Sequence, residues 1–304
     1  MQDGAAESKK YDLIALGETM LALGTAAGES IRDADALLID HAGAESNSCV
    51  GLARLGLRTA WISRLGADAA GDRILHALQQ EGVDTRWVRR DAARPTGLML
   101  KDAAANVRYY RHGSAASVLG PGDLADVPVA DARAVLVTGV TALIGAEPAA
   151  AALALLASSR GIRFVDPNLR PALWGSSRRA ELVLPLVERC DVLLGGAGEL
   201  AELAGAGDAE TLARRTSARG PREVVVRDAR CVGALTRDGR WIEVDIRRDA
   251  AVDPIGAGDA FNAGYIAVRL RGGAVEEAIR AGVYCGAAVT TTASDTAAFP
   301  RSLA

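Results

Sequence analysis

The chain carries a short segment, Gly256 to Asp259, in which two glycines precede a carboxylate at the predicted start of a helix. Apolar residues follow at helical spacing, at Phe261, Tyr265 and Val268, so the glycines fall at the helix N-terminus. Such an end exposes backbone N–H groups that lack helical partners, and it is the positive end of the helix dipole. We therefore predict an anion site of the kind that binds phosphate.

Asp259 indicates which chemistry that site would carry out. A carboxylate in the first turn of the helix would repel a phosphate, unless it acts on the group that attacks the phosphate. We therefore predict phosphoryl transfer, in which Asp259 is the general base for a substrate hydroxyl and the backbone of Gly256, Ala257 and Gly258 forms the anion hole. The alternative is a tight turn that Asp259 merely caps.

The elements that must position this segment follow from the hydrophobic pattern. Short apolar runs alternate with Ala/Leu-rich stretches from 13–16 to 223–227. This rhythm of β-α-β units predicts a mainly parallel sheet with helices on both faces. Two intervals, 18–41 and 95–112, break the rhythm with strand-like pieces that are too short to fold alone, so we expect them to pair into a small second sheet.

Composition excludes several classes of protein. The chain has 304 residues, of which 49% are apolar and 24% charged. Its net charge is −3 and its charged residues are interspersed along the sequence, which argues against a nucleic-acid partner. Lysine occurs only at positions 9, 10 and 101, so the glycine segment lacks the lysine of a P-loop or of a protein-kinase site.

Cysteine usage and hydropathy indicate the compartment. The four cysteines are widely spaced in apolar surroundings and predict buried free thiols; they are Cys49, Cys190, Cys231 and Cys285. The first ten residues hold no apolar core segment, and no apolar run approaches the length of a membrane span. We expect a cytoplasmic protein without a signal peptide or a membrane segment.

Several segments together resemble the signatures of the ribokinase-like, PfkB-type carbohydrate kinases. They read DPIGAGDAF at 253–261, GAESN at 43–47, GLARLG at 51–56 and GADAAG at 66–71. They occur in the family's order over residues 11 to about 300. Within the family, YYRHGSAAS at 109–117 and DPNLR at 166–170 are most similar to 2-keto-3-deoxygluconate kinases.

The resemblance implies an α/β, ribokinase-like fold with a mainly parallel central sheet, helices on both faces and a small β-sheet lid. It implies one kinase domain over 11–304, a lid formed by about 18–41 and 95–112, and a disordered tail over 1–10. It also implies ATP and Mg²⁺ as cofactors, and a homo-oligomer in which a dimer forms through the lid.

The resemblance assigns roles to individual positions, besides the catalytic role of Asp259 and the 256–258 backbone. Substrate contacts are implied at Glu18, Gly43, Asn47, Met99, Tyr109, Arg111, Arg170 and Asp259. Nucleotide contacts are implied at Gly196, Arg227, Gly233, Gly256, Ala257 and Gly258. Glu199 is implied to hold Mg²⁺ through water, and Asp253 a monovalent cation such as K⁺. Local alternatives remain, with Tyr109 as lid packing, Asn47 as the cap of the following helix and Asp253 as a turn residue.

Arg111 and Arg170 indicate an acid substrate, because a planar guanidinium binds a carboxylate through two parallel hydrogen bonds and keeps its charge. Arg111 ends a predicted lid strand, whereas Arg170 follows a strand end at the crevice where open α/β sheets bind ligands. The expected reaction is ATP-dependent phosphorylation of a primary hydroxyl of a sugar acid, 2-keto-3-deoxygluconate in particular.

Three departures from the family pattern leave alternatives open. Gly196 stands where the family usually has a polar residue ahead of Glu199, and the loop after 223–227 lacks the usual early glycine. Met99 stands where sugar acid kinases often have Tyr. The alternatives are a kinase for a neutral ketose or a nucleoside, and a non-catalytic family member that binds a sugar.

Overall fold

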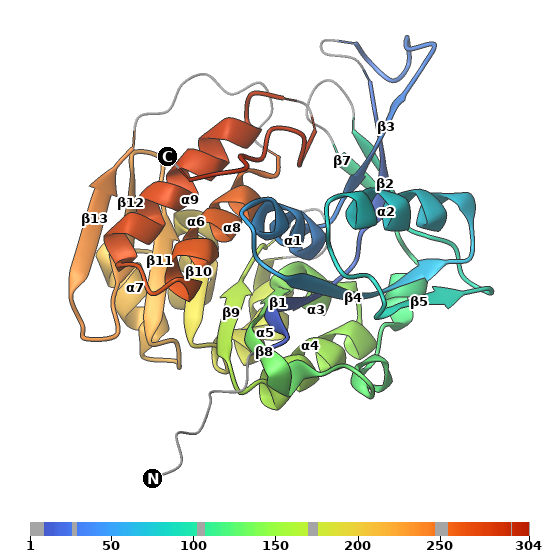
Figure 1. Cartoon of the computed structure of the whole chain (residues 1–304). Coiled ribbons are helices and arrows are strands. Elements are labelled where there is room, and N and C mark those ends of the chain that lie inside the picture. The colour runs from blue at the N-terminus through green and yellow to red at the C-terminus, as the bar shows by residue number, and fades with distance from the viewer. Residues whose placement is uncertain are drawn as a thin grey trace.

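The computed structural model describes residues 9–25, 29–101, 107–169, 176–246, 255–292 and 294–303. Its centre is a nine-stranded sheet in the order β13-β12-β11-β10-β9-β8-β1-β4-β5 (Figure 1). All neighbours pair in parallel except β11 with β12 and β12 with β13, which are antiparallel. In chain order the strands are β1 (Tyr11–Leu16), β4 (Thr59–Gly66), β5 (Val88–Asp91), β8 (Ala132–Thr138), β9 (Ile162–Asp166), β10 (Val192–Gly196), β11 (Glu223–Arg227), β12 (Cys231–Leu235) and β13 (Trp241–Asp245).

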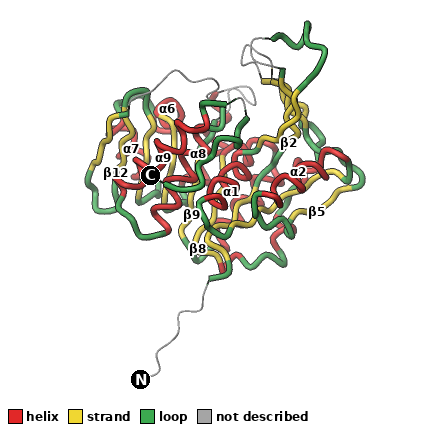
Figure 2. The backbone as a smooth tube through the Cα atoms, turned by 45° about the horizontal axis from the view of Figure 1, so that its top comes forward, coloured by secondary structure: helices red, strands yellow, loops and turns green. Residues whose placement is uncertain are grey.

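Helices cover both faces of this sheet, as the two views of the backbone show (Figures 1 and 2). One face carries α1 (Ala44–Arg54), α2 (Ala69–Gln80), α8 (Ala257–Leu270) and α9 (Val275–Val289). The other carries α3 (Gly139–Ile144), α4 (Ala146–Ser158), α5 (Ser176–Val187), α6 (Ala197–Ala204) and α7 (Ala209–Ser217). Short 3₁₀ turns are η1 (Ala115–Val118), η2 (Pro121–Leu124) and η3 (Val129–Asp131).

Each face of the sheet therefore has its own hydrophobic core. Alternate residues of β1 belong to the two cores, with Leu13 and Ala15 on one side and Ile14 and Leu16 on the other. All four are fully buried, as expected for a parallel strand that is covered by helices on both faces.

A second sheet of four strands, called the lid below, projects from the main body (Figures 1 and 2). Its order is β3-β2-β6-β7, formed by β2 (Met20–Gly24), β3 (Leu38–Ala42), β6 (Leu98–Lys101) and β7 (Val107–Tyr110). The parallel pairing of β2 with β6 joins the two intervals that break the β-α-β rhythm, as the sequence predicted. The α/β fold with two sheets is thus the one expected.

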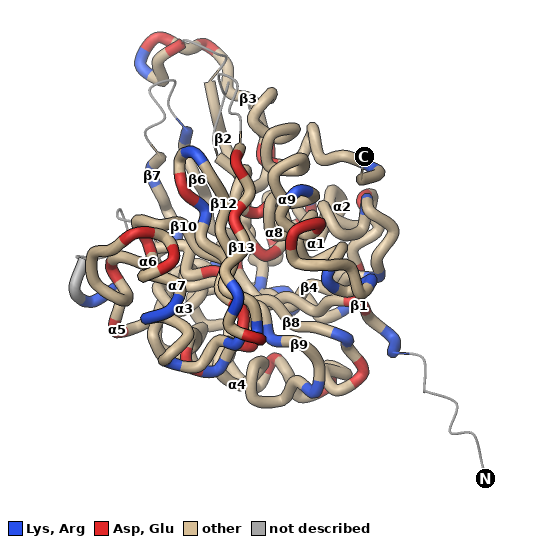
Figure 3. The backbone as a smooth tube through the Cα atoms, turned by 90° about the vertical axis from the view of Figure 1, so that its left-hand side faces the viewer, with Lys and Arg blue, Asp and Glu red and all other residues tan. Residues whose placement is uncertain are grey.

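The sequence pattern missed the antiparallel end of the main sheet. Strands β12 and β13 are joined through a turn at Gly239, whose backbone is left-handed (φ 82°). They follow β11 without a helix, so the β-α-β rhythm ends there. Acidic and basic residues are interspersed over the described chain (Figure 3).

Candidate active site

Helix α8 begins at the carboxyl edge of the main sheet, where it brings the glycine segment and Asp259 together. Gly256 is the N-cap residue and has a left-handed backbone (φ 83°), and its carbonyl accepts the first helical bond from the Ala260 N–H at 2.9 Å. A Cβ at Gly256 would lie 2.9 Å from the carbonyl oxygen of Asp295. A glycine is therefore required there both by conformation and by space.

Asp259 is buried, and its carboxylate is held by Asn47 from α1. The Asn47 Nδ2 donates to Asp259 Oδ2 at 2.9 Å, and the same nitrogen lies 3.5 Å from Asp295 Oδ2. The Asn47 Oδ1 is buried and has no hydrogen-bond partner among the described residues. Asn47 lies inside α1, whose N-cap is Gly43, so the alternative in which Asn47 caps that helix is wrong.

A small cavity of about 60 Å³ lies between the lid and Asp259. Most of the residues that were predicted to contact a substrate line this cavity. The lining includes Glu18, Gly43, Asn47, Met99, Tyr109, Arg111, Asp259 and Asp295.

Glu18 and Arg111 form a buried ion pair at one side of this cavity. Arg111 Nε donates to Glu18 Oε2 at 2.6 Å, and Arg111 Nη2 contacts the same oxygen. The Ser114 hydroxyl donates to Glu18 Oε1 at 2.8 Å. Both carboxylate oxygens of Glu18 therefore have protein partners, and the Arg111 guanidinium lies 5.6 Å from the centre of the Tyr109 ring.

Packing within the protein explains the residue types at Gly43 and Met99, which line this cavity. A Cβ at Gly43 would lie 2.5 Å from the Glu18 carbonyl oxygen, so the protein's own backbone already requires the glycine. Met99 packs with Met20, Ala22 and Ala42 in the small core of the lid.

A second cavity of about 290 Å³ lies on the other side of Asp259, along the ends of β9, β10 and β11. Among the residues that the structure describes, three carboxylates and one cation line it together with the start of α8. The lining residues are Asp166, Asn168, Leu169, Glu199, Arg227, Ile255, Gly256, Gly258 and Asp259.

Glu199 closes the N-terminus of α6 and also holds the turn after β9. Its Oε2 accepts from the Gly196 N–H at 2.8 Å, and its Oε1 accepts from the Leu169 N–H at 2.8 Å. Burial, and then the nearby charge of Asp166, raises the pKa of Glu199. Asn168, in the same turn, has a left-handed backbone (φ 38°), which Asn tolerates better than most residues.

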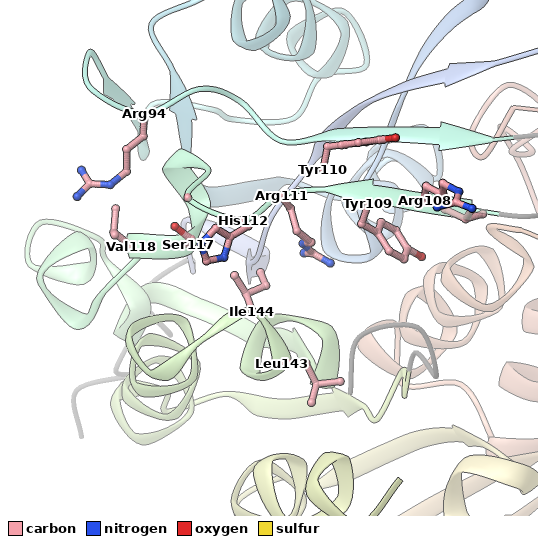
Figure 4. Close-up of a pocket in the computed structure, with 12 residues that line it drawn as sticks. Arg94, Arg108, Tyr109, Tyr110, Arg111, His112, Ser117, Val118, Leu143 and Ile144 are labelled. Atoms are coloured by element: carbon pink, nitrogen blue, oxygen red, sulfur yellow. The ribbon is translucent and has the colours of Figure 1, made fainter. Parts of the chain in front are cut away.

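A third and wider cavity, of about 790 Å³, opens on the outer side of the lid strand β7 (Figure 4). It shares Val107, Tyr109 and Arg111 with the small cavity, and the side chains of Tyr109 on β7 and of Arg111 just after it point toward α3. Among the described residues its lining holds three arginines and one histidine but no carboxylate. The lining residues are Arg94, Val107, Arg108, Tyr109, Tyr110, Arg111, His112, Gly113, Ser117, Val118, Leu143 and Ile144.

Some predicted site residues are not brought into this group. Arg170 and Asp253 lie outside the described residues, as does the segment 1–8. Gly233 lies in the middle of β12, and a Cβ there would meet the Trp241 indole at 2.0 Å. Gly233 is therefore explained by packing under Trp241, and it does not line the cavity beside Arg227.

Sequence reasoning missed two groups beside the small cavity. Lys101, at the end of β6, donates to Asp295 Oδ1 at 2.5 Å and so links the lid to the loop that touches Gly256. Glu45 is fully buried, and its Oε1 accepts from the Thr138 N–H at 3.1 Å and from the hydroxyls of Thr138 and Thr141 at 2.8 and 2.6 Å. Burial raises the pKa of Glu45. The one signal available in the sequence was that Glu45 lies between Gly43 and Asn47, which were both predicted to contact a substrate.

The sequence model of the pfkB family carbohydrate kinases matches residues 9–301. A 2-dehydro-3-deoxygluconokinase of Bacillus subtilis (strain 168) is 32% identical over 291 residues, which cover 91% of this chain and 89% of the relative. A 2-dehydro-3-deoxygalactonokinase of Haloferax volcanii is 32% identical, with 94% and 93% covered.

Solved structures agree with the fold. A PfkB protein from Polaromonas sp. JS666 superposes with a TM-score of 0.83 at 34% identity, covering 92% of this chain and 96% of that one. An E. coli protein that was solved with ATP and Mg²⁺ superposes with a TM-score of 0.88 at 21% identity, covering 95% and 96%.

The chain belongs to the pfkB family of carbohydrate kinases. It is an ATP-dependent carbohydrate kinase of ribokinase-like fold. No helix among the described residues is long and apolar enough to cross a membrane.

Proposed function

We propose that this kinase phosphorylates a primary hydroxyl of a sugar acid, namely 2-keto-3-deoxygluconate or a close analogue. The observation that carries the proposal is the position of Asp259, which lines both the 60 Å³ cavity under the lid and the 290 Å³ cavity at the strand ends. A base at the junction of two cavities can act on a sugar hydroxyl on one side while a nucleotide phosphate approaches from the other.

In this proposal Asp259 accepts the proton of the sugar hydroxyl as that oxygen attacks the γ-phosphate of ATP. The Asn47 Nδ2 keeps the Asp259 carboxylate oriented, and the Asn47 Oδ1 accepts a hydrogen bond from a second hydroxyl of the sugar. The first-turn N–H groups of α8, which have no acceptors within the helix, stabilise the negative charge on the transferred group.

A divalent cation is part of the proposal because of the charges in the nucleotide cavity. Among the described residues, Asp166, Glu199 and Asp259 face it together with the cation Arg227, so the polyphosphate of ATP would be repelled without further positive charge. Carboxylates that act through water suit Mg²⁺, and Glu199 and Asp166 are the residues that would hold it. Mg²⁺ supplies neutralisation of the phosphate charge. The monovalent cation at Asp253 is proposed from the sequence alone.

The acid preference is proposed from the cationic outer cavity that adjoins the small cavity, which is itself lined by Glu18, Asp259 and Asp295 together with Arg111. Arg111 lines it directly, and the adjoining outer cavity adds Arg94, Arg108 and His112 without a described carboxylate. The relatives named for 2-dehydro-3-deoxy sugar acids, at 30–32% identity, support the same substrate class.

A second candidate, a kinase for a neutral ketose, is favoured by one observation. Arg111 is already neutralised by Glu18, so its fork is not open to a substrate carboxylate on that side. A fructokinase of Klebsiella pneumoniae is 31% identical over 81% of this chain.

The deciding experiment is a coupled ADP-release assay with Mg-ATP against matched acids and neutral sugars. We expect kcat/KM for 2-keto-3-deoxygluconate to exceed that for fructose and ribose. If fructose were turned over in preference to the acid, the proposed substrate would be a neutral ketose and not a sugar acid. An absence of ADP release with every sugar, while one still binds by calorimetry, would leave only a sugar-binding role.

We also propose that the protein is a dimer formed through the lid, and that it works in the cytoplasm. Four of the exposed large apolar side chains lie on or beside the lid strands; they are Leu37, Leu38, Ile39 and Tyr110. Leu38→Glu should therefore shift the sedimentation coefficient to that of a monomer. Tyr284→Glu, at an exposed position on α9, is the matched control. A wild type that sediments as a monomer contradicts the dimer.

A further inference from the structure

Arg227, the last residue of β11, reaches across the strand ends to the first turns of α8. Its Nη1 donates to the Gly258 carbonyl oxygen at 3.2 Å and to Asn262 Oδ1 at 2.9 Å. Its Nη2 donates to Asp166 Oδ2 at 3.1 Å and to the Leu194 carbonyl oxygen at 3.3 Å. The two terminal nitrogens of an arginine carry four hydrogens, and each is matched here by one protein acceptor.

Because the protein accepts all four of these hydrogens, Arg227 has few donors left for a phosphate. Only the Nε hydrogen has no acceptor in the described part of the chain, so a phosphate that took the fork would displace protein partners. One of them, the Asp166 carboxylate, is buried and depends on this cation and on the Asn262 amide, which donates to the same oxygen at 2.7 Å. Leaving a buried carboxylate without partners costs folding free energy. We therefore expect the guanidinium of Arg227 to keep its protein partners and not to bind a phosphate.

The bond to Gly258 connects the guanidinium to the catalytic turn. The Gly258 carbonyl belongs to the same peptide group as the Asp259 N–H, so a charged donor on that oxygen fixes the plane of the peptide. It also polarises the peptide, which makes the N–H a better donor. A Cβ at position 258 would lie 3.6 Å from Arg227 Nη1, an ordinary van der Waals contact, so the approach of the guanidinium does not depend on the glycine.

We propose that Arg227 is a positioning residue for phosphoryl transfer. It holds the first turns of α8 against Asp166 and β10, and so sets where Asp259 and the anion-binding N–H groups stand, without itself being a phosphate ligand. This inference rests on the proposed role of Asp259.

The same placement gives Glu199 a neighbouring charge. Arg227 Nη2 lies 3.9 Å from Glu199 Oε2, so a positive charge stands beside Glu199 although Gly196 offers it no polar side chain. The polar partner that the sequence lacks at Gly196 is therefore supplied by another strand.

The test compares Arg227→Met and Arg227→Lys with the wild type in two assays, steady-state turnover and calorimetric binding of Mg-ATP. We expect Arg227→Met to lower kcat by about 10–100-fold, the usual loss when a supporting contact behind an active group is removed. The Kd for Mg-ATP should stay within about threefold, because no phosphate contact is lost. Arg227→Lys keeps the charge and the bond to Asp166, so it should restore part of kcat.

Arg269→Met is the matched control, because Arg269 also joins α8 to β11, at the opposite end. It binds Glu223 through Nε at 3.2 Å and through Nη2 at 2.9 Å, far along the strand from the cavity. We expect Arg269→Met to lower the melting temperature while kcat is kept. Should Arg227→Met fail to fold, Asn262→Ala removes one acceptor of Arg227 and the second donor to Asp166, and it should show the same fall in kcat.

Two results would overturn the inference. A rise of the Mg-ATP Kd by about tenfold or more with kcat preserved would make Arg227 a phosphate ligand. An unchanged kcat in both Arg227→Met and Asn262→Ala would leave Arg227 with no role in the reaction. If the wild type phosphorylates no sugar, the proposed function fails, whereas the Mg-ATP arm, which needs no sugar, still tests whether Arg227 binds phosphate.

Discussion

At the scale of single residues, Asp259 combines three features that a general base needs. It stands in the first turn of α8, its carboxylate accepts from Asn47 Nδ2, and it borders both cavities. Burial excludes water, and the amide bond fixes which oxygen faces Asn47.

Asp259→Asn should abolish turnover while sugar binding remains, because the change keeps the shape and removes the basicity. We expect kcat to fall by about 10²–10⁴-fold and the calorimetric Kd for the sugar to stay within about threefold. Asp208→Asn is the control, since Asp208 caps α7 through the Thr211 N–H and Asn caps equally well. Turnover of Asp259→Asn near the wild-type rate would remove Asp259 from the base role.

Gly256 is the second position where one residue type is required. Gly256→Ala should destabilise the fold by about 1–2 kcal/mol through its left-handed backbone, and it should also lower kcat, because the new methyl group meets Asp295. Gly239→Ala has the same left-handed backbone (φ 82°) with no atom within 4 Å, so it should lose stability alone. Thermal melting and ADP release separate the two effects, and equal activity in both variants would argue against the steric part.

At the scale of elements, the lid and the body meet through ion pairs between distant segments. Glu18 follows β1, Arg111 follows β7, and Lys101 at the end of β6 reaches Asp295 in the C-terminal segment. The 60 Å³ cavity under the lid is therefore bordered by ion pairs, and removing one member of a pair leaves its partner without a counter-charge.

Arg111→Ala should thus be a poor probe of substrate class, because it leaves Glu18 buried without its cation. We expect it to cost about 3–5 kcal/mol of stability, measured by denaturant unfolding. The double variant Glu18→Gln with Arg111→Met should recover most of that loss.

The double variant then reports on the substrate. We expect it to bind sugar acids about 10–150-fold more weakly and neutral sugars nearly as the wild type does, because a charge-assisted bond is lost only with the acid. Equal losses for both substrate classes would favour the ketose kinase.

At the scale of the whole molecule, two hydrophobic cores on either face of one sheet bury three of the four cysteines. Burial raises the pKa of the Cys49 and Cys190 thiols and raises the pKa of Cys285 to about 12. Cys231, at the start of β12, is only partly buried.

Because the thiolate is the reactive form, native protein at pH 8 should be alkylated by iodoacetamide at Cys231 well before the other three. Mass-spectrometric mapping after timed labelling checks this order, and labelling in denaturant should reach all four sites. Equal rates at Cys49 and Cys231 in native protein would contradict the burial that the fold assigns.

The amino-acid sequence by itself determined the local features. The alternation of apolar runs and Ala/Leu-rich stretches predicts β1, β4, β8, β9, β10 and β11 and the helices α1, α2, α4 and α5, since strand and helix periodicity are written in neighbouring residues. The pattern did not predict β5, α3, α6 or α7. The glycine-rich start of α8 and the place of Asp259 in its first turn are equally local. The turn to antiparallel strands after β11 was missed, because periodicity does not carry strand direction.

Only the tertiary structure decided which side chains meet. The sequence suggested that Asn47 caps a helix or binds a sugar. In the structure Asn47 donates to the carboxylate of Asp259, which lies 212 residues further along the chain. Glu18 was expected to contact sugar hydroxyls, and in the structure it lines the cavity while its carboxylate accepts from Arg111 and Ser114. The terminal nitrogens of Arg227 donate to acceptors in α8, β9 and β10. Such pairings depend on where parallel strands end at one edge of the sheet, and no local pattern encodes that juxtaposition.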